Sequence, residues 1–182
     1  MLLALLGLAA SAPPLQAQPA EQRGAPVAEL DGRPLLELSS YPRGTVRVSR
    51  ADGSATHEFR VWIADTPERQ TQGLMFVRDL PASEGMLFIN ERPRLSGFWM
   101  RNTYIPLDML FIDARGRIVT IHANTTPHSL ETRSSPKPVR AVLELRGGEA
   151  ARRGIRVGDR VAHAVFGTAR AARPERGAAT TP

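Results

Sequence analysis

The feature that most constrains the fold of this 182-residue chain is the block at residues 73–121, where short apolar runs alternate with Gly and Pro. The block holds Trp99, four of the five methionines and four of the six phenylalanines. Short apolar runs bounded by turn-forming residues favour β-strands over helices. The density of large apolar side chains predicts that this block forms the core.

The rest of the chain extends this pattern of strands and turns. The sequence Asp65-Thr66-Pro67-Glu68 combines a capping acceptor, a first-turn proline and an acid, which predicts a short helix ended by Gly73. Polar residues predict loops at 91–97 and 123–138, and residues 113–116 form the turn of a predicted hairpin. Strands are predicted at 45–48, 57–64, 74–76, 86–89, 98–103, 107–112, 117–121, 139–145 and 160–166, with a helical turn at 150–153. We therefore expect a mainly β fold, an antiparallel β-sandwich or barrel-like domain with one or two short helices.

The ends of the chain differ in composition from the middle. Residues 2–10 are apolar and are followed by small residues with a cleavage point after Ala17, which predicts a signal peptide at 1–17. We expect a flexible arm at 18–43, a single β domain at 44–167 and a disordered tail at 168–182. The mature protein would then be periplasmic or secreted, with no membrane span.

Composition excludes several classes of function. The absence of cysteine excludes disulfides, thiolate metal sites and thiol catalysis. The net charge is +6, but the arginines are scattered and often stand beside acids, as in Glu68-Arg69 and Asp159-Arg160. This pattern is typical of a solvated basic surface rather than of a phosphate-binding stripe, so nucleic acid is not an expected partner.

A few polar residues interrupt the apolar block and its neighbouring strands. On a strand, Asp108 would share a face with Leu110 and Ile112, and an unpaired carboxylate buried there would be costly. One interpretation is a structural hydrogen-bond network. The functional interpretation is a patch that binds a small ligand or a protein surface, formed by Arg101, Asn102, Asp108, His128 and Glu144.

Two alternatives to a non-enzymatic binding module remain open. One is a hydrolase-like enzyme that uses Asp108, His128 and Glu144. The other is a periplasmic Cu(I)-binding protein, because thioether sulfur is a soft ligand, although methionine also fills irregular cores. Its ligands would be Met75, Met86 and Met100 with Trp99 or His122. The chain contains no H-E-x-x-H, no G-x-S-x-G and no glycine-rich phosphate loop, so we predict no catalytic residue, metal site or cofactor.

Several short words of sequence, taken in order and spacing, resemble a known family. They are Gly73-Leu74-Met75-Phe76 and the segments 85–88, 98–103, 105–113, 127–129, 142–148 and 154–161. Over residues of about 60–166 the chain resembles the domain-of-unknown-function family 192, also called uncharacterised protein family 127. The resemblance implies a mainly β domain and supplies no agreed activity or ligand. Arg101 stands where the family pattern usually carries lysine, which replaces a point charge with a planar fork.

Overall fold

The structure, a computed structural model, describes residues 29–168 and divides the chain into two units, 1–35 and 36–182. In the first unit, β1 (Glu29–Leu30) pairs with β2 (Arg33–Pro34) as an antiparallel hairpin. Its turn residues Asp31 and Gly32 have φ values of 51° and 76°, the left-handed conformation that tight two-residue hairpin turns require. The predicted signal peptide lies outside the described residues, as do residues 169–182 of the predicted tail.

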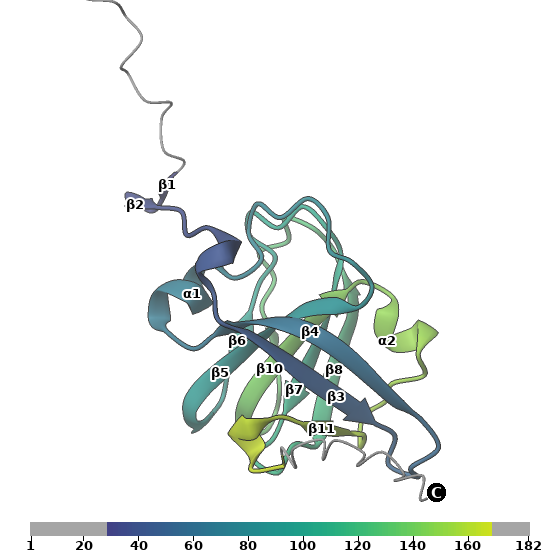
Figure 1. Cartoon of the computed structure of the whole chain (residues 1–182). Coiled ribbons are helices and arrows are strands. Elements are labelled where there is room, and N and C mark those ends of the chain that lie inside the picture. The colour runs from purple at the N-terminus through teal and green to yellow at the C-terminus, as the bar shows by residue number, and fades with distance from the viewer. Residues whose placement is uncertain (1–28, 169–182) are drawn as a thin grey trace, which may run out of the picture. The chain divides into compact units, whose positions relative to one another are not determined.

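The second unit is built on a seven-stranded sheet with the strand order β11-β3-β4-β5-β10-β7-β8 (Figure 1). Neighbouring strands are antiparallel except β4 and β5, which run parallel. The strands are β3 (Arg43–Ser49), β4 (Thr56–Ala64), β5 (Glu84–Arg94), β7 (Leu107–Ile112), β8 (Ile118–Thr125), β10 (Val139–Arg146) and β11 (Arg160–Ala162). A separate small sheet pairs β6 (Gly97–Phe98) with β9 (Arg133–Ser134).

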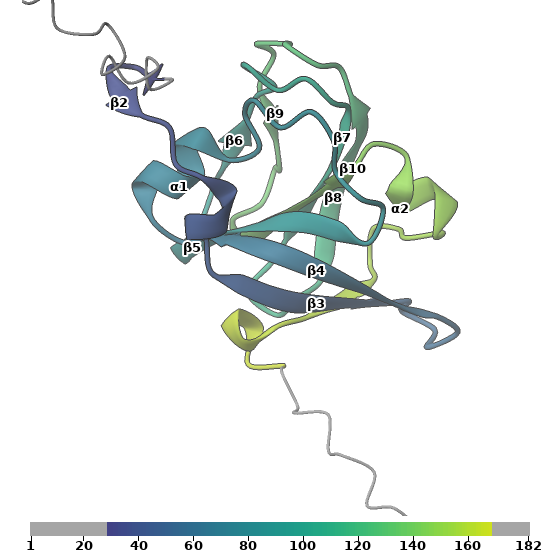
Figure 2. The ribbon, with the colours of Figure 1, turned by 45° about the horizontal axis from the view of Figure 1, so that its top comes forward.

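The seven-stranded sheet curls until its two edges meet (Figure 2). Arg117, just before β8, forms a β-bridge with Arg160 of β11. Beside it, the Val161 N–H donates to the Gly116 carbonyl at 2.7 Å. The prediction of a mainly β, barrel-like domain with short helices is therefore confirmed.

The curled sheet buries a different apolar cluster on each face. The inner cluster draws side chains from all seven strands and includes Phe59, Leu110 and Leu143. The outer cluster draws mainly on β5, β7 and β10 and on the loops that cover them, and it includes Met86 and Phe111. Because side chains alternate along a strand, each of these three central strands contributes to both clusters.

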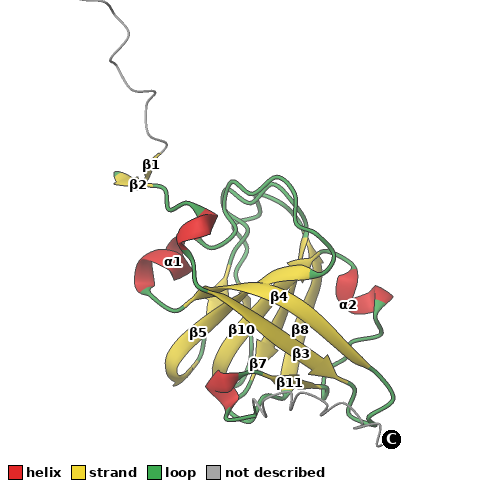
Figure 3. Cartoon of the chain, in the orientation of Figure 1, coloured by secondary structure: helices red, strands yellow, loops and turns green. Residues whose placement is uncertain are grey.

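Helix α1 (Pro67–Gln72) connects the parallel pair β4 and β5, and α2 (Glu149–Arg152) follows β10 (Figure 3). The Thr66 side chain caps α1 by accepting the Arg69 N–H, and Gly73 ends it with a φ of 51°. The short helix predicted before Gly73 is confirmed. Single 3₁₀ turns lie at Leu38–Ser40 and Ala164–Phe166.

The strand prediction at 74–76 is wrong, and the one at 98–103 is wrong beyond Phe98, because the backbone turns in both places. Phe76 and Asn102 have φ values of 65° and 54°, which no strand accommodates. The Phe76 N–H donates to the Asn102 carbonyl at 2.8 Å, so each turn holds the other. The predicted loop at 91–97 is instead largely strand, since β5 continues to Arg94. The last predicted strand, 160–166, ends at Ala162.

Candidate functional site

Two carboxylates, Asp108 and Glu144, lie on adjacent strands but on opposite faces of the sheet. In the pairing of β7 with β10, Asp108 is opposite Leu145 and Glu144 is opposite Met109. Leu145 belongs to the inner cluster and Met109 to the outer cluster. Asp108 therefore points inward and Glu144 outward.

Asp108 is fully buried, and its hydrogen bonds are all to the backbone. Its Oδ1 accepts the N–H groups of Asn124 at 2.7 Å and Gly148 at 3.0 Å. Its Oδ2 accepts the Ala150 N–H at 2.7 Å. A carboxylate with three such donors is well satisfied without a counter-ion. Asp108 thus ties the end of β8 to the start of α2.

Glu144 has the opposite environment, although it is only 4% exposed. Its register neighbours are Met86 on β5 and Met109 on β7, both fully buried. Burial raises the pKa of the Glu144 carboxyl from 4.5 to about 8. Within the described residues, this carboxyl makes no hydrogen bond or ion pair with another side chain or with the backbone.

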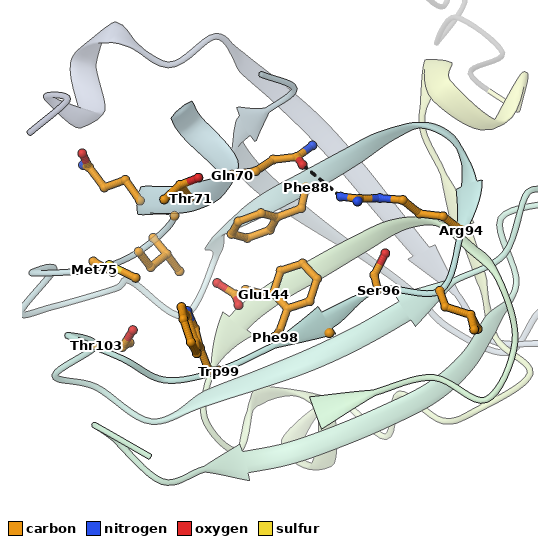
Figure 4. Close-up of a pocket in the computed structure, with 15 residues that line it drawn as sticks. Gln70, Thr71, Met75, Phe88, Arg94, Ser96, Phe98, Trp99, Thr103 and Glu144 are labelled. Carbon is orange, nitrogen blue, oxygen red and sulfur yellow. Dashed lines mark hydrogen bonds between the residues drawn. The ribbon is translucent and has the colours of Figure 1, made fainter. Parts of the chain in front are cut away.

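The Glu144 side chain reaches a cavity of about 310 Å³ on the outer face of the sheet (Figure 4). In that view its carboxyl lies among the rings of Phe88, Phe98 and Trp99. The Phe88 and Phe98 rings meet edge to face with centroids 5.0 Å apart, and Trp99 is 48% exposed. The remaining lining comes from Gln70, Thr71, Gln72, Gly73, Leu74, Met75, Arg94, Leu95, Ser96, Gly97 and Thr103.

Helix α1 forms one wall of the cavity, and its two glutamines fix it, Gln70 to strand β5 and Gln72 to the segment before β3. The Gln70 amide donates to the Ile89 carbonyl at 2.6 Å, and Gln72 exchanges two 2.7 Å hydrogen bonds with the backbone of Leu36. At Gly73 a Cβ atom would lie 2.9 Å from the Phe88 ring, so the backbone approaches this ring closely. The wall is therefore preformed by protein contacts.

The sequence that folds into this domain matches a protein-family model. The model of DUF192, described as "Uncharacterized ACR", matches residues 47–163. The chain belongs to the DUF192 family. This confirms the resemblance stated from the sequence.

Two solved structures resemble this DUF192 protein. A Sinorhizobium meliloti protein described as a "putative transcription regulator" is 44% identical, with a TM-score of 0.67. The match covers 69% of this chain and 97% of that chain. A Novosphingobium aromaticivorans protein of unknown function is 41% identical, with a TM-score of 0.64, over 66% of this chain and 85% of the other. No curated protein matches the chain.

Three of the residues predicted to bind a ligand lie on two loops of the DUF192 domain that run side by side. The Met100 N–H donates to the Ser129 carbonyl at 2.8 Å, and the His128 N–H donates to the Thr103 carbonyl at 3.2 Å. The guanidinium of Arg101 lies 5.7 Å from the centroid of the Trp99 ring.

The other side chains of these loops make contacts of their own. The His128 and Tyr104 rings have centroids 5.3 Å apart, and the Asn102 amide lies 4.0 Å from the Met75 sulfur. The five predicted residues are therefore split three ways: Asp108 on the inner face, Glu144 in the cavity, and the rest on the loops. That they bind a ligand stays a prediction.

The aromatic walls of the cavity were not predicted from the sequence. Phe88, Phe98 and Trp99 were interpreted as core residues, and nothing in their spacing brought them to Glu144. One signal was available: Glu144 is the acid in the otherwise apolar run 141–145 of a strand buried on both faces. That position required a partner or a cavity.

The structure also shows where the residues of the hydrolase-like site and of the Cu(I) site lie. Asp108 and Glu144 point to opposite faces, so they do not form one site with His128. Met86 and Met100 are fully buried, and the Met100 sulfur accepts the Thr125 hydroxyl at 3.1 Å. His122 is hydrogen-bonded to the Ser134 carbonyl at 2.9 Å.

Residues 29–168 also contain neither a metal-binding cluster nor a membrane-spanning helix. No group of three or more His, Cys, Asp or Glu side chains there could hold a metal ion. In the same part of the chain, no helix has the length and apolar character needed to cross a membrane.

Proposed function

We propose that this DUF192 protein is a binding module that takes a small organic ligand into the cavity over Glu144. The observation that carries the proposal is a carboxyl that is almost fully buried, faces a cavity and has no partner among the described residues. The carboxyl opens to the cavity and has no protein partner, so a ligand in the cavity can form hydrogen bonds with it.

The form of the cavity supports the same function. Its volume of about 310 Å³ falls at the lower end of the range of roughly 300–1,000 Å³ that is typical of small-molecule sites. Three aromatic residues, Phe88, Phe98 and Trp99, line the space around Glu144, and Ser96 and Thr103 are among the polar lining residues. Ligand sites commonly combine apolar walls with a few polar groups that fix orientation.

Binding is favoured over hydrolysis because the two candidate carboxylates lie on opposite faces of the sheet. General acid–base catalysis needs its groups within hydrogen-bond reach of one substrate. Asp108 is on the other face of the sheet with both carboxylate oxygens occupied. Glu144 is therefore left as an anchor rather than as one member of a catalytic pair.

Trp99 provides a direct test because its half-exposed ring lines the cavity. We would make Trp62→Phe, which leaves Trp99 as the fluorescent reporter, and screen a library of small organic compounds. We expect some compounds to change the fluorescence of Trp99 and to raise the melting temperature. A ligand at about a hundred times its Kd adds about 2.7 kcal/mol of stability.

The control is the same screen on Trp62→Phe/Trp99→Phe, in which binding should persist by melting temperature while the fluorescence signal disappears. If no compound shifts either signal at millimolar concentration, the proposed function fails.

We also propose that the protein is exported, and the support is the sequence alone. The apolar run 2–10 and the small residues up to Ala17 are typical of a secretory signal. Fractionation of the native host, with mass determination of the mature chain, should recover a protein that begins near Gln18 outside the cytoplasm. Full-length protein in the cytoplasmic fraction would contradict this.

A further inference from the structure

We infer that the cavity takes an organic cation, an ammonium or guanidinium group on an apolar body, with Glu144 as its anionic partner and Phe88, Phe98 and Trp99 as its walls. This inference rests on the proposed function and names the chemical class of its ligand. It follows from the charges and rings that surround the cavity.

The first argument is the missing counter-charge. Among the described residues that line the cavity, Glu144 is the one acid and Arg94 the one base. Arg94 is committed elsewhere: its Nε donates to the Asn90 side chain at 2.8 Å, and its Nη2 lies 3.5 Å from the Gln70 oxygen. In Figure 4 Arg94 is on the far side of the cavity from Trp99. A ligand cation can therefore reach Glu144 without displacing an existing ion pair.

The second argument is the aromatic surface. Rings attract cations over their faces, and this attraction grows when the cation is shielded from water. Trp99 already shows the preference, because the Arg101 guanidinium lies 5.7 Å from its ring centroid. A carboxylate among three rings offers a cation both a charge partner and faces to contact, whereas the negatively charged ring faces disfavour an anionic ligand.

The third argument supplies a measurable consequence. Because burial raises the pKa of Glu144 to about 8, most of the carboxyl groups are protonated at pH 7. A cation pairs with the ionised form, so its binding should release close to one proton at pH 7. Arg94 is the one other charged side chain that lines the described cavity. Affinity should rise nearly tenfold per pH unit from pH 6 to 7.5.

The test uses three probes that share one ring and differ in charge: benzylamine, benzyl alcohol and benzoate. Each is titrated into the full-length protein by calorimetry at pH 7.5, with Trp99 fluorescence in the Trp62→Phe background as the site reporter. Titrations in two buffers of different ionisation enthalpy count the protons released. The variant Glu144→Gln removes the charge and keeps the shape.

We expect benzylamine to bind about tenfold more tightly than benzyl alcohol, with proton release, and benzoate to bind least. In Glu144→Gln the advantage of benzylamine should disappear while benzyl alcohol keeps its affinity. If this variant does not fold, the order of the three probes and the proton count on the wild-type protein decide the question.

The outcomes separate the inference from the function on which it rests. If benzyl alcohol or benzoate binds at Trp99 at least as tightly as benzylamine, the inference of a cationic ligand is wrong, while the proposed ligand-binding function is supported. The same holds if the compound screen yields ligands but no cation among them. If none of the three probes and no compound in the screen binds, by calorimetry, Trp99 fluorescence or melting temperature, both the proposed function and the inference are wrong.

Discussion

Asp108 and Glu144 are one register position apart on paired strands, yet their surroundings differ completely. Asp108 faces the inner cluster, and three backbone N–H groups donate hydrogen bonds to its carboxylate. Its hydrogen-bonding capacity is therefore used within the fold. Glu144 faces the outer cluster and has a cavity where a partner would be. Burial alone therefore does not distinguish a carboxylate that the backbone satisfies from one that faces a cavity. The difference is that backbone N–H groups point at the Asp108 carboxylate, whereas none donates to the Glu144 carboxyl in the described residues.

Removal of the Asp108 carboxylate should give the largest effect. We expect Asp108→Ala to lower the free energy of unfolding by about 3–5 kcal/mol, because three backbone N–H groups lose a fully buried charged acceptor. Asp108→Asn keeps one acceptor oxygen and should lose about half as much. Denaturant titration measures both. A loss below about 1 kcal/mol for the alanine variant would remove the contrast between the two carboxylates.

Glu144→Gln should show a smaller effect that depends on pH. The folded pKa of about 8 lies above the ordinary 4.5, so the folded state holds this proton more tightly than the unfolded state. The stability that this group contributes is complete below about pH 4.5 and is lost as the pH rises to about 8, by roughly 1.4 kcal/mol per unit.

The E144Q variant lacks this ionisation, so it should gain on the wild type steadily between pH 5 and 8, by a few kcal/mol in total. Other ionisable groups are shared and cancel in the difference. Denaturation of both proteins across this range checks the slope; parallel curves would mean that Glu144 is not desolvated.

Glycines on the two sides of the sheet allow a third comparison. Gly73 of the cavity wall and Gly148 beside Asp108 both have positive φ values, 51° and 85°. A Cβ at Gly73 would meet the Phe88 ring at 2.9 Å, whereas at Gly148 it would meet nothing within 4 Å. We expect Gly73→Ala to cost about 2 kcal/mol and Gly148→Ala about 1 kcal/mol. Equal losses in thermal unfolding would show that the wall yields to the added methyl group.

Trp99→Ala should change stability least, by less than about 1 kcal/mol, because half of the ring is already exposed. The same substitution should weaken benzylamine by about tenfold if the ring is a wall of the site. Tyr104→Ala is the matched control, since this aromatic is also partly exposed but does not line the cavity. Calorimetry on both variants separates the two roles.

Local rules were sufficient wherever neighbouring residues determine the structure. Alternation predicted β3, β4 and β10, a short apolar run predicted β7, and the Thr66-Pro67 cap with Gly73 predicted α1. They failed at Phe76 and Asn102, where a hydrogen bond between two distant turns holds each backbone in a left-handed conformation that its own sequence does not favour. They also ranked Asp108 ahead of Glu144 as the central polar residue.

By itself, the sequence determined a mainly β chain of the DUF192 family with an apolar block at its core. It did so because period-two patterns and turn residues act over a few positions. Only the tertiary structure decided that α1, β6 and Trp99 enclose Glu144 while the start of α2 satisfies Asp108. Those partners come from residues far along the chain: strand alternation sets the face on which each carboxylate lies, and the tertiary packing on that face supplies donors or leaves a cavity.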